Sequence, residues 1–149
     1  MEVEVIKMCA NMMKFGMKDK EVIGGFFSGG TESIIMAILA YREYGYHAKG
    51  IKNPNLVICV SGHAAAIKGS NYFDVEVRRV KCDKEYKMDV KDMKSKMDSN
   101  TICVYTSYPN YPYGTTDDMD TIASICKKKD VPVHIDMCLG GFLVPFLKK

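Results

Sequence analysis

The sequence predicts an α/β fold in which a mainly parallel sheet is covered by helices. Between residues 56 and 136, short apolar runs alternate with stretches of helical periodicity, as in strands joined by helical crossovers. The run at 56–60 is continuously apolar, which favours a strand buried on both faces, and 101–106 is interpreted as another buried strand. Neither an internal repeat nor a linker interrupts the 149 residues, so we expect one domain or part of one.

The chain begins with two predicted helices. Apolar residues recur at helical spacing over residues 2–15, and a loop that contains Gly16 follows. A segment rich in Ile, Ala, Met and Leu then predicts a second helix over residues 31–46. The turn at 50–55 contains Pro54 and separates this helix from the first strand.

The rest of the chain alternates between strand and helix. Strands are expected at 56–60, 74–82, 101–106 and 131–136. Helices are expected at 64–72, 89–97 and 117–129. The second strand is inferred from valines that alternate with charged residues, and the last helix from an acidic start and a lysine-rich end, which match the helix dipole.

The composition excludes several classes of protein. The hydrophobic fraction of 47% is too high for a disordered chain. The 21 basic and 18 acidic residues are scattered, so a dedicated nucleic-acid binder is not indicated. The apolar runs are far shorter than the roughly 20 residues of a membrane span. The acidic start, Met1 to Glu4, lacks the layout of a signal peptide, so we expect a soluble chain that is not exported.

The six cysteines do not form a known metal or redox motif. They contain no CxxC pair, which argues against a zinc knuckle or a thioredoxin motif. Several lie in apolar runs, as Cys59 does, so we expect small buried hydrophobic side chains in a reducing compartment.

Ligands of parallel sheets bind beyond the carboxyl ends of the strands, and this rule selects three places. The first is the segment 28–33, Ser-Gly-Gly-Thr-Glu-Ser, at the start of an apolar helix. Its free N–H groups suit a phosphate, although a plain helix cap explains the same residues. A P-loop is excluded because Thr31 stands where the lysine is needed, and no G-x-G-x-x-G spacing supports a dinucleotide site.

The other two places follow the first and last strands. His63 comes directly after the strand at 56–60, either as a ligand-facing residue or as a helix cap or core histidine. His134 and Asp136 close the last strand and share one face by alternation. A carboxylate there requires a cation, a metal or a protonated ring nitrogen, unless it serves as a helix cap or an ion pair. The three histidines lack metal-ligand spacing, so no metal site is expected.

In this order, an anion loop, a histidine and a strand-end aspartate resemble pyridoxal-phosphate enzymes of the aspartate-aminotransferase-like fold, fold type I. Within that superfamily, four strings resemble the sphingosine-1-phosphate lyase family. They are SGGTESI (28–34), SGHAA (61–65), PNYPYG (109–114) and HIDMCLGGF (134–142). The last string is specific to the lyases within the wider group of pyridoxal-phosphate-dependent decarboxylases, whereas GGTES is shared with that group.

The resemblance implies pyridoxal 5′-phosphate as cofactor and assigns a role to four residues. Gly30 and Thr31 would hold the phosphate, His63 would stack on the pyridine ring, and Asp136 would pair with its protonated nitrogen. The implied reaction is retro-aldol cleavage of a phosphorylated sphingoid base to a long-chain aldehyde and phosphoethanolamine. The family also implies a homodimer on the cytoplasmic side of the endoplasmic reticulum membrane.

The chain departs from the family pattern in several respects. The lysine that holds the cofactor covalently is expected beyond residue 149, because Lys148 and Lys149 lie too close to Asp136. We therefore expect residues 1–149 to be part of the cofactor-binding large domain, without the small C-terminal domain or the N-terminal anchor. Tyr113 stands where the family usually has histidine, which would alter acid–base chemistry. Gly62 stands where it usually has alanine, a difference that we expect to be harmless.

Three functional hypotheses follow. The first is part of a sphingosine-1-phosphate lyase, inactive without the rest of the enzyme. The second is a degenerate, non-catalytic module of the same fold. The third is a related amino-acid decarboxylase, against which the string Cys138–Phe142 argues.

Overall fold

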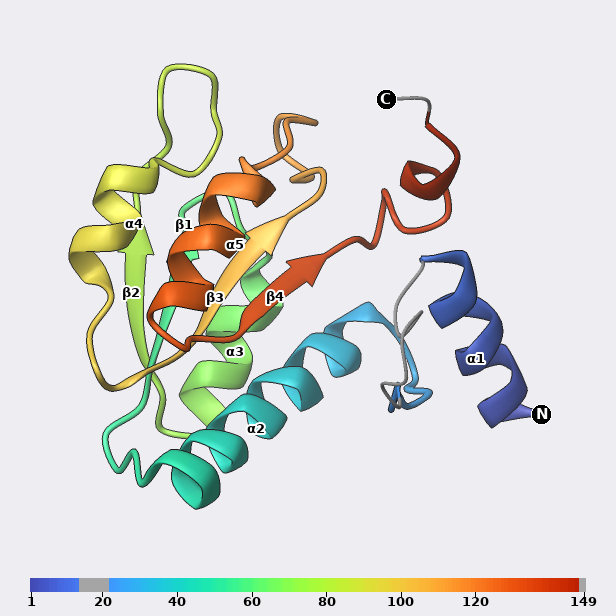
Figure 1. The fold of residues 1–149 in the computed structure, drawn as a ribbon, viewed down its shortest axis with the longest axis horizontal. Helices are drawn as coiled ribbons and strands as arrows, with labels where there is room; N and C mark the ends of the chain where they lie inside the picture. The colour runs from blue at the N-terminus through green and yellow to red at the C-terminus, as the bar shows by residue number, and fades with distance from the viewer. Residues whose placement is uncertain (14–21, 148–149) are drawn as a thin grey trace.

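The computed structural model describes residues 1–13 and 22–147 of the chain. Its centre is a four-stranded, fully parallel sheet in the order β2-β1-β3-β4 (Figure 1). The strands are β1 (Asn55–Cys59), β2 (Glu76–Val80), β3 (Thr101–Ser107) and β4 (Val133–Asp136). The predicted α/β class and parallel sheet are confirmed. Residues 14–16 of the predicted first helix and loop, and Lys148 and Lys149, lie outside the described residues.

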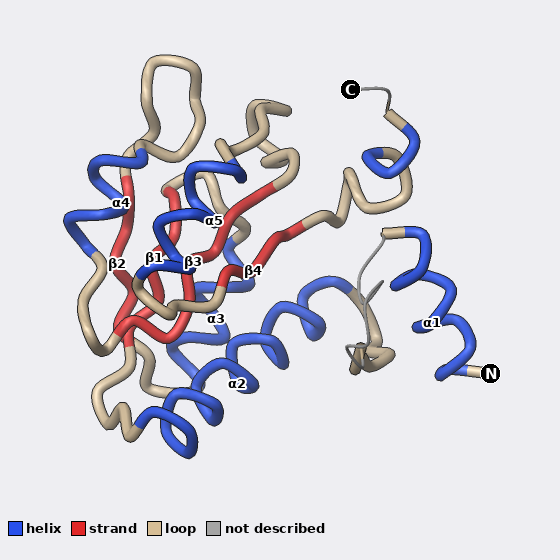
Figure 2. The backbone as a smooth tube through the Cα atoms, viewed as in Figure 1, coloured by secondary structure: helices blue, strands red, loops and turns tan. Residues whose placement is uncertain are grey.

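Helices cover both faces of the sheet, as Figures 1 and 2 show. The helices are α1 (Glu2–Met12), α2 (Gly30–Lys49), α3 (Ala64–Tyr72), α4 (Val90–Lys96), α5 (Met119–Lys128) and a short 3-10 helix at Val144–Phe146. Helices α2 and α3 pack on one face, and α4 and α5 on the other. Helix α1 stands beside the start of α2, away from the sheet (Figure 1). Among the described residues, no helix combines the length and apolar character needed to cross a bilayer.

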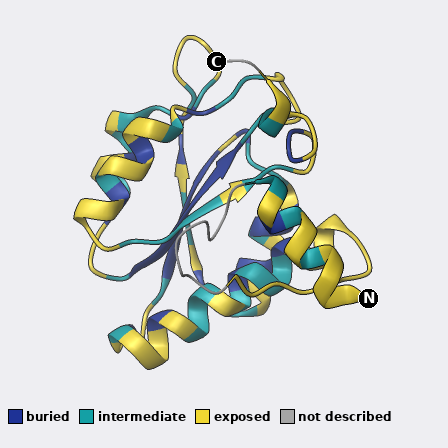
Figure 3. Cartoon of the chain, turned by 45° about the vertical axis from the view of Figure 1, so that its right-hand side comes forward, coloured by how far each residue is buried: buried dark blue, intermediate teal, exposed yellow. Residues whose placement is uncertain are grey.

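The sheet separates two hydrophobic cores because successive side chains of a strand point to opposite faces. Every residue of β1 and β3 is buried, as the dark strands of Figure 3 show. Leu56, Ile58 and Tyr105 belong to the core beneath α2 and α3. Val57 and Cys59 belong to the core beneath α4 and α5. The continuous apolar runs of the sequence therefore reflect burial on both faces, as predicted.

Helix α2 runs antiparallel to the strands. Its last residue, Lys49, forms an ion pair of 2.9 Å with Asp130, just before β4 begins. The end of α2 thus lies at the amino edge of the sheet. Its 20 residues extend about 30 Å, which carries Gly30 toward the carboxyl edge. The helix ends at Gly50, whose φ of 68° lies in the left-handed region that glycine adopts without strain.

Two glycines allow close packing around α2. A Cβ on Gly45 would lie 2.7 Å from Cγ2 of Ile102 in β3. A Cβ on Gly69 of α3 would lie 3.1 Å from the Cα of Ile35 in α2. Because α2 approaches both neighbours so closely, its position over the sheet is tightly defined.

Candidate functional site

The carboxyl edge of the sheet contains a topological switch point. From β1 the chain proceeds to β2 on one side and then crosses to β3 on the other side. In open α/β sheets the crevice outside such a point is the usual ligand site. His63 follows β1 at this crevice, and Asp136 is the last residue of the next strand but one, β4. The predicted location of these two residues at strand ends is confirmed.

The start of α2 has no side-chain cap. The N-cap residue is Gly29. Instead the Glu32 carboxylate accepts a hydrogen bond of 2.6 Å from the backbone N–H of Ser28. The bonds that Ser28 donates to Glu32 lower the pKa of this exposed carboxyl group. The alternative interpretation of these residues as a plain Ser or Thr cap is therefore wrong, and the hydroxyl of Ser33 donates to the Gly29 carbonyl.

This arrangement leaves donors at the first turn of α2. The first intrahelical bond runs from the N–H of Ser33 to the Gly29 carbonyl. The N–H groups of Gly30, Thr31 and Glu32 precede it, so none of them has a carbonyl partner in the helix. Gly30 and Thr31 are exposed. Uncapped N–H groups at the positive end of a 20-residue helix are suited to bind a phosphate.

His63 is the N-cap of α3, so the helix-cap interpretation is confirmed. Its Nδ1 accepts a hydrogen bond of 3.1 Å from the N–H of Ala65. A neutral ring that accepts at Nδ1 carries its proton at Nε2. The bond lies in the ring plane and so leaves the ring faces available for stacking. Tyr111 packs against the same ring, with centroids 5.6 Å apart and an interplanar angle of 61°.

Gly62 has little room for a side chain in this structure, and the expectation that glycine in place of the family's alanine is harmless stays a prediction. A Cβ on Gly62 would lie 2.7 Å from both Cγ1 and Cδ1 of Ile58 and 3.1 Å from the Cys59 carbonyl oxygen. Ile58 is 1% exposed and part of the core. An alanine at 62 therefore requires Ile58 to repack, because a methylene as deeply packed as Cγ1 cannot simply swing into solvent.

Asp136 is held by two neutral donors. Its Oδ2 accepts a bond of 2.5 Å from the hydroxyl of Tyr105, and its Oδ1 accepts one of 3.1 Å from the N–H of Cys138. The sequence predicts a cation, a metal or a protonated ring nitrogen as partner, or a helix cap or ion pair, and the tyrosine hydroxyl is a partner that the structure adds. Burial, the bond to Asp136 and its charge all raise the pKa of Tyr105, so this residue remains a proton donor.

His134 lies on the same face as Asp136, as alternation predicts. Its ring stacks on Tyr105 with centroids 4.8 Å apart and an angle of 16°. The ring of Tyr41, from α2, meets it edge-on at 5.9 Å. Burial lowers the pKa of His134, although the charge of Asp136 opposes this effect. The imidazole is therefore a neutral packing partner, and it does not form an ion pair with the carboxylate.

Comparison with known proteins decides the family. The sequence profile of the pyridoxal-dependent decarboxylase conserved domain matches residues 1–149. The chain belongs to this family. The predicted cofactor, pyridoxal phosphate, is confirmed at the level of this family.

Several relatives of the chain are named sphingosine-1-phosphate lyase. A sphingosine-1-phosphate lyase of Drosophila melanogaster is 44% identical over 149 residues, which are 99% of this chain and 27% of that protein. The solved sphingosine-1-phosphate lyase of Burkholderia pseudomallei is 33% identical with a TM-score of 0.90, over 97% of this chain and 34% of that one. The predicted resemblance is confirmed, and the chain spans about a quarter of the length of the curated relatives it matches.

A more distant decarboxylase supports the fold alone. The glutamate decarboxylase of Lactobacillus brevis is 21% identical with a TM-score of 0.82, over 99% of this chain and 36% of that one. The predicted membership of fold type I is confirmed by these structures.

The loop after β3 of this decarboxylase-family chain is organised by Asn110, which is 1% exposed. Its side chain accepts from the N–H of Tyr113 and donates to Thr115 and to the carbonyl of Tyr86. Tyr113 stacks on Tyr86 with centroids 4.4 Å apart. The residue of this loop that contacts His63 is Tyr111, so a catalytic effect of Tyr113 stays a prediction.

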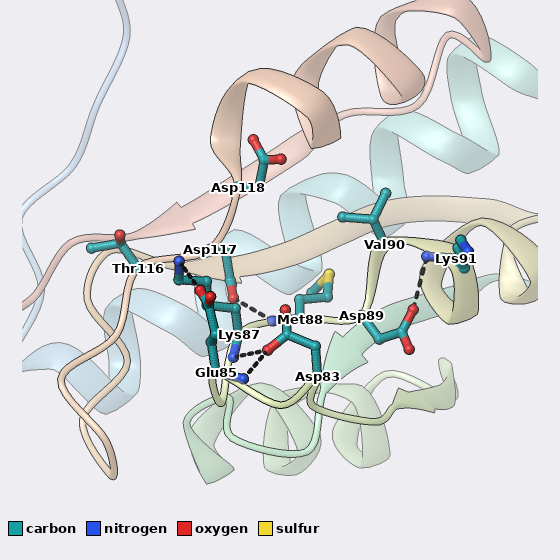
Figure 4. Close-up of a pocket in the computed structure, with 10 residues that line it drawn as sticks. All are labelled: Asp83, Glu85, Lys87, Met88, Asp89, Val90, Lys91, Thr116, Asp117 and Asp118. Atoms are coloured by element: carbon teal, nitrogen blue, oxygen red, sulfur yellow. Dashed lines mark hydrogen bonds and ion pairs between the residues drawn. The ribbon is translucent and has the colours of Figure 1, made fainter.

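A pocket lies between this loop and the start of α4 (Figure 4). It is lined by Asp83, Glu85, Lys87, Met88, Asp89, Val90, Lys91, Thr116, Asp117 and Asp118. Four of its carboxylates accept bonds from backbone N–H groups, which explains their presence structurally. Asp117, for example, accepts from Met88 at 2.8 Å and from Ser107 at 2.9 Å. Over residues 1–13 and 22–147 no cluster is suited to hold a metal ion.

Sequence reasoning missed Tyr105 as a residue of the site. It lies in the middle of a buried strand, where an aromatic residue is ordinarily part of the core. The structure pairs Tyr105 with His134 and Ser107 with Asp136 across the β3–β4 ladder. This register brings the Tyr105 hydroxyl to the Asp136 carboxylate. A buried tyrosine and a strand-end acid on neighbouring strands are the sequence features that could have indicated the pair.

Proposed function

We propose that this chain supplies the pyridoxal-phosphate-binding surface of a sphingosine-1-phosphate lyase. The observation that carries the proposal is the tyrosine-bound carboxylate at the carboxyl end of β4, beside the switch point. The lyases of Drosophila melanogaster and Burkholderia pseudomallei support the choice of activity. When bound, pyridoxal phosphate accepts the electron pair released as the C2–C3 bond of a phosphorylated sphingoid base breaks.

Each of the predicted residues has a distinct task in this proposal. The N–H groups of Gly30 and Thr31 bind the phosphate at the positive end of α2. The in-plane bond to Ala65 fixes the ring of His63, which stacks on the pyridine and defines its plane. Asp136 pairs with the pyridine nitrogen and keeps it protonated, because a carboxylate close to a ring N–H favours the charged form of the ring.

Tyr105 and His134 act on this site through Asp136. The Tyr105 hydroxyl occupies Oδ2 and the Cys138 N–H occupies Oδ1, which together fix the plane of the carboxylate. The stacked ring of His134 covers one face of the Tyr105 ring, which is itself 0% exposed. A fixed, partly dehydrated carboxylate interacts more strongly with a ring cation than a freely rotating one.

The activity belongs to a longer protein in this proposal. Residues 1–149 are part of the cofactor-binding large domain, and the lysine that holds the cofactor lies in sequence beyond it. The longer protein would be a homodimer at the cytoplasmic side of the endoplasmic reticulum membrane. Leu139, Phe142, Leu143, Phe146 and Leu147 are more than half exposed, which supports a covering partner or domain.

Cofactor binding is testable without the covalent lysine. Pyridoxine 5′-phosphate lacks the aldehyde, so it cannot react with surface lysines, and calorimetry would measure its non-covalent affinity. We expect binding of pyridoxine 5′-phosphate, weaker binding of pyridoxine, and at least a tenfold loss with Asp136→Ala, about 1.4 kcal/mol or more. Equal affinity of both compounds, or no loss with Asp136→Ala, would contradict the assignment.

The activity is testable in a chimera. Residues 1–149 would replace the matching segment of the Drosophila melanogaster lyase, and release of long-chain aldehyde from sphingosine-1-phosphate would be measured. We expect cleavage by the chimera and none by its Asp136→Ala variant. A folded chimera that binds the cofactor but releases no aldehyde would favour the non-catalytic module instead.

A further inference from the structure

We propose that Cys59 and Cys82 form a reversible disulfide, which makes them a redox-modification site on the sheet face opposite Tyr105. The two Sγ atoms lie 3.5 Å apart. The described residues include all six cysteines, and this is the one pair of sulfur atoms in contact. The pair does not stand out in the sequence, because its members lie 23 positions apart.

The two sulfur atoms need to move only a short distance to form a bond. A disulfide bond is about 2.05 Å long, so the two sulfur atoms must approach by about 1.5 Å. Cys59 is the last residue of β1 and is paired in register with Val80 of β2. Cys82 lies two residues beyond Val80, outside the strand. The backbone of both residues is held, Cys59 by the sheet and Cys82 by a bridge to Met88, so rotation of the two side chains about their Cα–Cβ bonds supplies the movement.

The two thiols differ in accessibility. Cys59 is 4% exposed, and burial raises its pKa to about 11, although the Ser61 hydroxyl partly offsets this effect. Cys82 is only partly buried, so of the two thiols it is the more accessible to a dissolved oxidant. The pair thus combines an accessible thiol with a protected one, the arrangement of a peroxidatic and a resolving cysteine.

The reaction balances with a peroxide as oxidant. The thiolate of Cys82 attacks one oxygen of hydrogen peroxide, forms a sulfenic acid and releases hydroxide. The Cys59 thiol then attacks the Cys82 sulfur, the S–O bond breaks, and the thiol proton leaves with the hydroxyl group as water. Two sulfur atoms are oxidised by one each while the peroxide is reduced. A dithiol reverses the bond by exchange.

The disulfide would act on the candidate site through Ser61. The Ser61 hydroxyl donates a bond of 3.2 Å to the Cys59 sulfur, and His63 follows two residues later. Movement of that sulfur toward Cys82 lengthens this bond and shifts the turn that carries His63. This consequence for cofactor affinity rests on the proposed function, whereas formation of the disulfide does not.

Peptide mapping without reduction tests the disulfide in the 149-residue chain. After treatment with hydrogen peroxide and alkylation of free thiols, we expect a peptide that joins Cys59 to Cys82, lighter by two hydrogen atoms than the unlinked pair. Dithiothreitol should abolish it, as should Cys82→Ser, whereas the matched variant Cys138→Ser should leave it unchanged. Oxidation of Cys82 to a sulfinic acid without the link, or a link that forms only in urea, would overturn the proposal.

Hydrogen exchange tests the effect on the turn separately. We expect faster amide exchange at residues 61–66 in the oxidised chain, and no such change in oxidised Cys82→Ser. Unchanged exchange would overturn the coupling to His63. Pyridoxine 5′-phosphate affinity distinguishes the proposals, because a reduced chain that does not bind it contradicts the proposed function and leaves the disulfide standing.

Discussion

Replacing Tyr105 with phenylalanine tests the pair that orients Asp136. The substitution removes only the hydroxyl, so the ring keeps its stack on His134 and its place in the core. The lost bond is 2.5 Å long, ends on a carboxylate and comes from a side chain that is 0% exposed. Hydrogen bonds to charged groups contribute about 1.5–3 kcal/mol.

The expected loss is at the lower end of that range. Asp136 is only partly buried and retains the bond from Cys138, so water can replace part of the lost interaction. We expect Tyr105→Phe to lower the free energy of unfolding by about 1–2 kcal/mol. Urea denaturation followed by circular dichroism measures this change, and the slope with urea should stay constant.

A double-mutant cycle isolates the interaction from other effects. The cycle combines Tyr105→Phe with Asp136→Ala, and we expect a coupling energy of about 1–2 kcal/mol. Tyr41→Phe, which removes a hydroxyl from the other ring that contacts His134, serves as the matched control. A coupling energy below about 0.5 kcal/mol would refute the argument that the hydroxyl holds the carboxylate.

Three further predictions concern stability and loop structure. Gly62→Ala should destabilise the chain by about 1–3 kcal/mol in urea denaturation, because Ile58 must repack. Burial alone would raise the pKa of Asp98. Hydrogen bonds from an asparagine and from Arg78 outweigh this effect and lower the pKa to about 2. The wild type should therefore exceed Asp98→Asn in stability above about pH 4, and denaturation at several pH values should show the gap closing toward pH 2. Asn110→Ala should accelerate amide exchange in residues 110–115, because three side-chain bonds of the loop are lost.

Each of these predictions has a control or an opposing outcome. Gly29→Ala should cost less than Gly62→Ala, because nothing lies within 4 Å of a Cβ at Gly29. Glu85→Gln should leave the acid profile unchanged, since its ion pair with Lys87 is largely exposed. A pH-independent difference in stability between the wild type and Asp98→Asn would contradict a lowered pKa of Asp98. Unchanged exchange in Asn110→Ala would show that the loop does not depend on its side chain.

Most of the fold could be predicted from periodicity. The predicted bounds of α3, 64–72, agree with the structure, and all four strands lie where apolar or alternating runs placed them. The differences lie at the ends of elements. The second strand begins at Glu76 and not at 74, because Asp74 adopts a φ of 53°. Helix α2 continues to Lys49, because Gly50 is the residue whose left-handed conformation ends it.

The candidate site was predictable only in part. His63 and Asp136 are found at strand ends, and a local rule about parallel sheets suffices to select them. The Tyr105–Asp136 bond joins residues 31 positions apart, and the Cys59–Cys82 contact joins residues 23 apart. Both depend on the relative register of neighbouring strands. A single sequence does not specify this register, because β1 and β3 are buried on both faces and either face can pack against the core.

The number of residues in helix α2 determines both the distance between its two ends and their relative rotation about the helix axis. The Lys49–Asp130 pair anchors one end at the amino edge of the sheet, and the N–H donors of Gly30 lie at the other end. An α-helix advances about 1.5 Å and turns about 100° with each residue. One residue inserted between Gly30 and Gly45 would therefore rotate the first turn by about 100° relative to the sheet while leaving the side chains at the anchored end in place. The direction of the N–H groups at the start of α2 thus depends on the number of residues between that end and the packed end of the helix, in addition to the residue types.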